Sequence, residues 1–150
     1  MQSSIAKYID ETKTLITQKY INDISCKIVG CAIEVHKQVG PGLLESVYHS
    51  CLIEELKNNN LDVRSQIHIP VNYKGKDLGG ILKLDILVNN LIIVELKAVD
   101  VMIPLYNAQL LSYLKLANIP KGLLINFHSE NIVQQLVPMV TEEFSKLPKE

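Results

Sequence analysis

The sequence predicts a domain of the α/β (α+β) class, in which a central mixed β-sheet is flanked by helices. Apolar residues recur at helical spacing as far as residue 56, and between residues 63 and 73 they occupy alternate positions, as in a half-buried strand. Further apolar runs at residues 81–88, 91–97 and 122–127 have the length of strands. The chain has 150 residues, of which 47% are hydrophobic, and this supplies one buried core.

Composition excludes several classes of protein. Lys and Arg number 15 and Asp and Glu number 16, so nucleic acid could be held only by a local basic patch. No apolar run reaches the roughly 18 residues of a membrane span, and charges interrupt the first 20 residues. We therefore expect a cytoplasmic protein without a membrane partner. Cys26, Cys31 and Cys51 lack the spacing of a disulfide or zinc motif and are expected to be small buried side chains.

Two core helices are expected in the first part of a single domain that spans residues 1–150. Residues 1–22 are interpreted as a helical appendage, and the core is expected over about residues 23–140. Asn22 or Asp23 would cap the first core helix, whose apolar stripe Ile24, Ile28, Cys31, Ile33 and Val35 ends at a Gly-Pro-Gly break. The second core helix follows from Leu43 and carries Glu45 in its first turn, where the helix dipole favours an acid.

The remaining elements follow in order. Residues 63–73 are predicted to form a strand at a sheet edge, because Pro70 lacks the N–H that a central strand needs. The later elements are strands at 81–88 and 91–97, a helix at 105–117, a strand at 122–127 and a strand or extended tail at 132–140.

Two acids interrupt the apolar strands. Glu95 follows four apolar residues and lies two residues before Lys97, and Asp85 lies within the run 81–88. A charge in a buried strand costs several kcal/mol unless it is paired or binds a metal. Two carboxylates could hold Mg²⁺ while the lysine lies near an attacking water or a phosphate. An ion pair that closes the sheet end is the equally weighted alternative.

The connection between the two strands decides whether these acids can meet. A regular two-residue turn would pair Asp85 with Val94, so Asp85 and Glu95 would point to opposite faces. A shared metal requires a three-residue connection that pairs Val88 with Ile92, or a bulge. We predict one of these two arrangements.

Gln109 and Tyr113 lie four residues apart in an apolar helical run, so they project from one helix face. They could position a ligand, although an amide and a hydroxyl that bond to backbone are the common alternative.

The stretch GLLESVY at residues 42–48 resembles the signature of the GxxExxY protein family, which is assigned to the PD-(D/E)xK nuclease superfamily. The similarity covers about residues 23–128. It implies a restriction-endonuclease-like core, a metal site with Mg²⁺ or Mn²⁺ at one end of the sheet, and DNA or RNA as the substrate.

The resemblance also implies residue roles. It assigns catalysis to Asp85, Glu95 and Lys97, metal binding to Glu45, Asp85, Glu95 and the Leu96 carbonyl, and positioning to Gln109 and Tyr113. Tyr106 stands where a histidine is frequent in the family.

We therefore expect a Mg²⁺-dependent nuclease that acts on nucleic acid, with a homodimer among the assemblies to consider. The alternative is a non-catalytic module that keeps the fold and binds nucleic acid or protein. The single arginine, Arg64, and the net charge of −1 favour this alternative, because both are poor for binding a polyanion.

Overall fold

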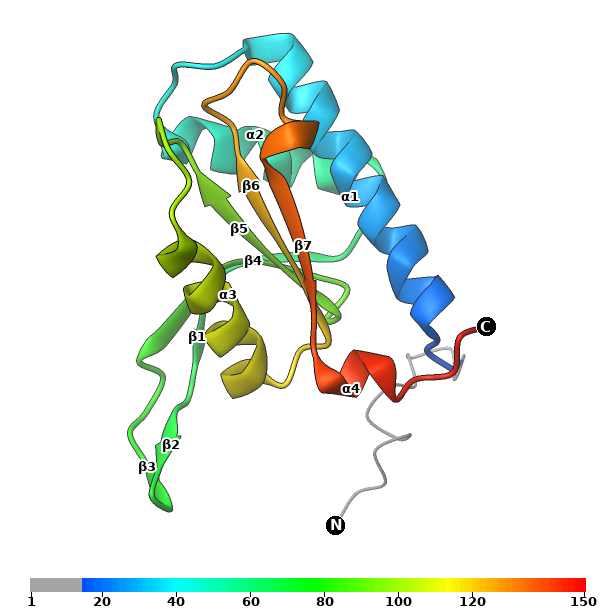
Figure 1. Ribbon diagram of the computed structural model, residues 1–150, viewed down its shortest axis with the longest axis vertical. Helices are drawn as coiled ribbons and strands as arrows, with labels where there is room; N and C mark the ends of the chain where they lie inside the picture. The colour runs from blue at the N-terminus through cyan, green and yellow to red at the C-terminus, as the bar shows by residue number, and fades with distance from the viewer. Residues whose placement is uncertain (1–14) are drawn as a thin grey trace.

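The computed structural model describes residues 15–150, in which a five-stranded mixed sheet has helices on both faces (Figure 1). The predicted fold class is confirmed. The elements are α1 (Gln18–Val39), α2 (Glu45–Asn58), β1 (Val63–Ile69), β2 (Asn72–Tyr73), β3 (Lys76–Asp77), β4 (Leu82–Val88), β5 (Ile92–Lys97), α3 (Pro104–Ala117), β6 (Lys121–Asn126), the short 3-10 helix η2 (Val133–Gln135), β7 (Leu136–Val140) and α4 (Glu142–Ser145).

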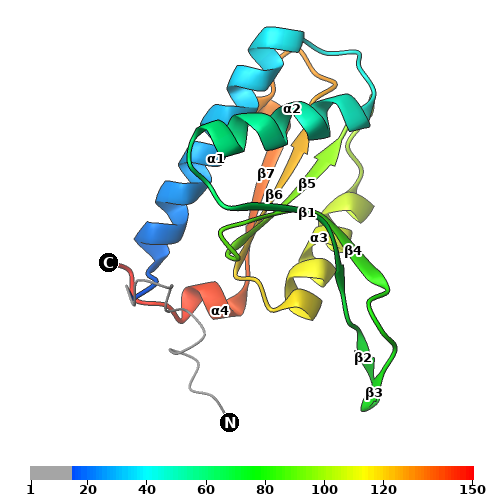
Figure 2. The same ribbon diagram turned by 180° about the vertical axis from the view of Figure 1, so that it is seen from behind.

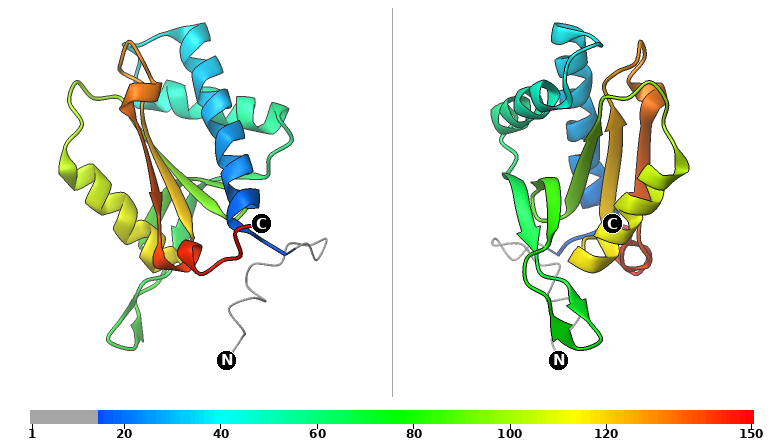
Figure 3. Two further views of the ribbon diagram at one scale, coloured as in Figure 1. Left: turned by 45° about the vertical axis from the view of Figure 1, so that its right-hand side comes forward. Right: turned by 90° about the vertical axis from the view of Figure 1, so that its left-hand side faces the viewer.

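The sheet has the strand order β1-β4-β5-β6-β7, and only β5 and β6 run parallel. Helices α1 and α2 cover one face and α3 covers the other (Figure 3). Ile28 and Leu52 are fully buried on the first face, and Leu114 is fully buried on the second. Burial of each such side chain contributes roughly 1.5–3 kcal/mol. No helix within residues 15–150 is long and apolar enough to cross a membrane.

Helix α1 begins earlier than predicted. Its cap is Thr17 rather than Asn22 or Asp23, because the Thr17 hydroxyl accepts a hydrogen bond from Tyr20 N at 3.0 Å. The extra turn buries Ile21, so the core begins before residue 23. Of the predicted appendage, residues 1–14 lie outside the described part of the chain, and residues 18–22 belong to α1.

One residue of the predicted α1 stripe is wrong. Ile33 is 41% exposed and Ala32 is buried instead, because residues two apart on a helix do not share a face. The expectation that all three cysteines are buried is also wrong, since Cys26 is exposed, whereas Cys31 is buried and Cys51 is half-buried.

The last residues of the chain pack beside the start of α1. Gln18 N donates to Pro148 O at 2.8 Å, and Lys19 N donates to Lys149 O at 3.0 Å. Helix α4 precedes this contact and buries Phe144. This helix was not among the predicted elements, because four residues are too few to show helical periodicity.

Strand β1 lies at the sheet edge, as predicted, but it ends at Ile69, before Pro70. The chain then forms the β2–β3 hairpin, which projects beyond the sheet (Figure 2). Its tip is Lys74-Gly75, with φ values of 51° and 81°. Two such left-handed residues are typical of a type I′ turn.

Tyr48 fixes the loop between α1 and α2. Its ring is fully buried and stacks on Phe127 with 4.7 Å between centroids. Its hydroxyl donates to Gly40 O at 2.6 Å and accepts from Leu43 N at 3.1 Å. The loop ends where α2 begins, so these contacts place Glu45 in the first turn of α2.

We expect Tyr48→Phe to lower the free energy of unfolding by about 1–3 kcal/mol, because Gly40 O and Leu43 N lose their shared partner. Urea unfolding followed by circular dichroism measures this loss. Tyr73→Phe is the control, because Tyr73 is 60% exposed, and it should change stability by less than about 0.5 kcal/mol. Equal effects of the two substitutions would show that the Tyr48 hydroxyl does not stabilise the loop.

Candidate active site

Strands β4 and β5 are joined by a three-residue connection. Val88 pairs with Ile92, and the register continues through Leu87 and Ile86 toward Asp85 and Glu95. This is one of the two arrangements that the sequence predicted. The connection contains Asn89 and Asn90, both left-handed with φ near 50° (52° and 55°), a conformation that asparagine tolerates.

The regular backbone pairing of β4 and β5 stops before Asp85 and Glu95, and their side chains take its place. Asp85 N donates to Glu95 Oε1 at 3.3 Å, and Leu96 N donates to Asp85 Oδ2 at 3.2 Å. Each carboxyl thus bonds to the backbone of the opposite strand.

The side chains of β4 switch from one face of the sheet to the other at Asp85. Leu84 packs in the core on the α3 side, whereas Ile86 packs in the core under α1 and α2. Residues two apart in a regular strand share a face, so β4 twists sharply between them. The opposite residue on β1, Gln66, has a φ of 52° and is skipped in the β1–β4 pairing. The irregularity frees Asp85 from the ladder on this side.

Burial and like charge dominate the electrostatics of the acid pair. Glu95 is only 6% exposed. Desolvation, followed by the charge of Asp85, raises the pKa of Glu95 to about 9, and Lys97 counteracts part of this rise. Near neutral pH a proton on Glu95 therefore relieves the repulsion between the two carboxyls.

Glu45 is close enough to interact with this pair, although it is exposed to solvent. Neighbouring protein atoms displace part of its water and raise its pKa, and the charge of Asp85 adds to this effect. Lys97 and His49 act in the opposite direction. The start of α2 therefore lies near Asp85 of β4 and Lys97 at the end of β5.

Lys97 and the polar residues of α3 lie on the other side of the acids. Lys97 Nζ is 4.5 Å from the ring centroid of Tyr106, within the range of a cation–π contact. Gln109 Nε2 donates to Tyr113 Oη at 2.9 Å, so the predicted polar pair is in contact. Burial raises the pKa of Tyr113, and the charge of Glu95 raises it further.

His49 belongs to this neighbourhood, although it was not among the predicted site residues. Its Nε2 lies 3.3 Å from the backbone oxygen of Asp85 and 3.2 Å from Gln66 Nε2. The available signal was its position four residues after Glu45, which places both side chains on one face of α2.

The donor set fits a hard divalent cation, although no ready-made cluster is present. Within residues 15–150, no three His, Cys, Asp or Glu side chains converge closely enough to hold a metal. Asp85 and Glu95 are adjacent, the Leu96 backbone bonds to Asp85, and the charge of Asp85 raises the pKa of Glu45. Carboxylate and carbonyl oxygens are the ligands that Mg²⁺ prefers.

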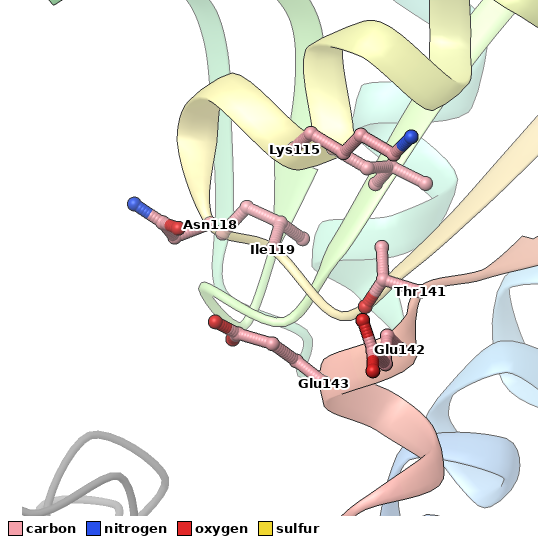
Figure 4. Close-up of a pocket in the computed structure, with 7 residues that line it drawn as sticks. Lys115, Asn118, Ile119, Thr141, Glu142 and Glu143 are labelled. Atoms are coloured by element: carbon pink, nitrogen blue, oxygen red, sulfur yellow. The ribbon is translucent and has the colours of Figure 1, made fainter.

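A pocket of about 240 Å³ lies elsewhere, between the end of α3 and the start of α4 (Figure 4). Its lining residues are Leu114, Lys115, Asn118, Ile119, Thr141, Glu142 and Glu143. None of them is a predicted site residue. Asp85 lies in β4 and Glu95 in β5, so this pocket is separate from the candidate site.

Comparison with known proteins agrees with the fold. The model of a family described as the PD-(D/E)XK nuclease superfamily matches residues 22–137. A solved structure described as "Crystal structure of SSO0001" is 19% identical and superimposes with a TM-score of 0.51 over 95% of this chain and 79% of that one. This likeness concerns the fold alone. No curated protein sequence matches the chain.

We expect the metal-free protein to lose stability as the pH rises. Because the pKa of Glu95 is about 9 when folded and near its ordinary 4.5 when unfolded, the folded state holds one more proton between these values. The free energy of unfolding should therefore fall across this window by up to about 1.4 kcal/mol per pH unit. Urea unfolding in EDTA at several pH values measures the slope.

Glu95→Gln carries a neutral amide, so its free energy of unfolding should depend less on pH in this window. Glu54 is an exposed acid of α2, and Glu54→Gln should keep the wild-type slope. Parallel pH profiles for wild type and Glu95→Gln would contradict the assignment of the proton to the acid pair.

Proposed function

This chain belongs to the PD-(D/E)XK nuclease superfamily, and we propose that it is a divalent-metal-dependent enzyme that hydrolyses phosphodiester bonds of nucleic acid. The observation that carries the proposal is the contact between the buried Glu95 and the half-buried Asp85, with Lys97 two residues further along β5. Within the superfamily we propose the GxxExxY family, on the basis of the stretch GLLESVY at residues 42–48.

We assign metal binding to Asp85 and Glu95, assisted by Glu45 and the Leu96 carbonyl. A buried pair of carboxylates needs a positive charge, and Mg²⁺ or Mn²⁺ would replace the proton that Glu95 otherwise holds. When bound, the cation would polarise a phosphoryl oxygen and lower the pKa of a water molecule.

The surrounding side chains supply the remaining chemistry. The Lys97 ammonium would stabilise the negative charge that develops on the phosphate, and the Tyr106 ring holds it in position. The Tyr113 oxygen accepts from Gln109, so its own proton can be donated to a phosphate oxygen or a water. His49 lies against the Asp85 backbone and would help to fix the direction of that acid.

One observation favours the second candidate, a non-catalytic module that binds nucleic acid or protein. The carboxyls of Asp85 and Glu95 already bond to strand N–H groups, which is a structural role that needs no metal. Metal binding separates the two candidates. For either candidate we propose a cytoplasmic location, and the assembly to test is a homodimer.

We expect isothermal titration with Mn²⁺ to detect binding to the wild type, accompanied by a higher melting temperature. Asp85→Asn and Glu95→Gln should abolish binding while the fold is retained, whereas Glu54→Gln should bind normally. An absence of heat and of a thermal shift at millimolar Mn²⁺ would exclude the metal site.

Lys97→Ala should keep metal binding but lower cleavage of single- and double-stranded DNA or RNA by roughly 100-fold or more, since it removes a charge that acts on the transition state. Cleavage by Lys97→Ala at the wild-type rate would remove Lys97 from the mechanism. If the wild type binds metal without cleaving any of these substrates, the non-catalytic candidate is supported.

A matched pair of substitutions tests how Lys97 is held. Tyr106→Phe keeps the ring face and should retain activity, whereas Tyr106→Leu should lower kcat/KM by roughly 2- to 30-fold, the equivalent of one cation–π contact. Metal affinity should be the same in both variants. Equal activities of the two variants would show that the Tyr106 ring does not position Lys97.

A further inference from the structure

We propose that the β2–β3 hairpin, residues 70–81, is an arm that binds the phosphodiester backbone of nucleic acid beside the acid pair. This segment is called the hairpin arm below. The inference deepens the proposed function, because it assigns a surface of the chain to holding the polyanion that the acids would cleave.

The hairpin arm is ordered by its own backbone and has almost no packing on the core. Asn72 pairs with Asp77 and Tyr73 pairs with Lys76, and Leu78 N donates to Val71 O at 2.9 Å. Every residue from 72 to 81 is exposed. The arm extends away from the sheet in all views (Figures 1–3). A two-stranded hairpin in this position buries little apolar surface, so packing of the core does not explain why it is there.

The charge of the arm has the opposite sign to that of the chain. Residues 70–81 contain two lysines, Lys74 and Lys76, and one acid, Asp77, which gives +1 in a chain of net charge −1, and Lys83 follows at the start of β4. The single acid is turned toward the backbone, since Asp77 Oδ1 accepts from Gly79 N at 2.8 Å. The lysines are therefore the charges that a ligand of the arm would meet.

The apolar side chains of the arm suit the same ligand. Tyr73 is 60% exposed, and Lys74 Nζ lies 5.5 Å from its ring centroid. An exposed aromatic ring beside cations is the combination with which proteins stack bases and bind phosphates. Ile81 is 65% exposed at the base of the arm and widens this surface.

The arm is joined directly to the acid pair through β4. Lys83 lies two residues from Asp85 and Lys76 lies nine residues from it. At about 3.4 Å per residue, the extended path from Asp85 to Lys76 is at most roughly 30 Å, which is less than one turn of a DNA duplex. A nucleic acid on the arm could therefore present a phosphate to the acids.

The lysines of the arm also offset the repulsion between the acids of the site and a polyanion. Glu45, Asp85 and Glu95 repel a polyanion when they are charged, and the net charge of the chain offers no general attraction. Basic residues at a short distance supply a local attraction that the site itself lacks.

The test measures binding by the full chain in EDTA, so that it does not depend on cleavage. Fluorescence anisotropy of labelled single- and double-stranded DNA and RNA oligonucleotides is recorded at several salt concentrations. The variants are Lys74→Ala/Lys76→Ala and a control of equal charge, Lys27→Ala/Lys37→Ala, which changes two exposed lysines of α1. Circular dichroism checks that every variant is folded.

We expect the arm variant to bind roughly 10-fold more weakly at low salt and to lower the slope of log K against log salt by about 1–2, as loss of two phosphate contacts requires. The control should bind like the wild type. Tyr73→Ala should weaken single-strand binding most.

Two results would overturn the proposal: equal affinity of the arm and control variants, or no binding of any of these oligonucleotides by the wild type. A change of oligomeric state in the arm variant, seen by sedimentation velocity without a change in binding, would assign the arm to self-association instead. If the arm variant loses binding while the wild type cleaves nothing, the arm stands and the nuclease proposal fails.

Discussion

The rest of the site depends on the contact between two carboxyls, the half-buried Asp85 of β4 and the buried Glu95 of β5. Asp85 and Glu95 replace backbone groups in the sheet, and each bonds to the opposite strand. Their meeting requires the three-residue connection at one end of β4 and the change of face at Asp85 at the other. Fully ionised, the pair would repel itself in a poorly solvated position, so the pKa of Glu95 is raised and its proton relieves the repulsion.

Aromatic residues hold the groups that surround this pair. Tyr48 locks the loop that precedes α2 and thereby sets Glu45, while Tyr106 lies under the Lys97 ammonium. Flat side chains with few rotatable bonds lose little conformational entropy when they are fixed, so they suit the task of positioning longer charged ones. The candidate site thus combines groups that could act chemically with rigid neighbours that restrict where they point.

Most of the fold, and the central pair of the site, could be predicted from the sequence. Apolar periodicity located the long helices and the strands, and the demand that Asp85 and Glu95 share a face restricted the register to two arrangements, of which one is present. The rest depends on tertiary contacts. Nothing local distinguishes Thr17 from Asn22 as a cap, and the left-handed φ of Gln66 follows from the twist of its partner strand. His49 belongs to the site only because the fold brings the backbone of Asp85 next to it, which no local pattern predicts.

The same balance of charges connects stability with the proposed function. A protein that only needed a stable sheet would place an apolar pair between β4 and β5, where Glu95 is now desolvated beside a like charge. On the proposed function, a cation in place of the proton would offset the cost of that pair, because it would satisfy both carboxylates at once. Features that destabilise the isolated chain in this way are typical of sites shaped by binding rather than by folding. The acid pair therefore argues for a metal ligand more strongly than the type and spacing of its residues do alone.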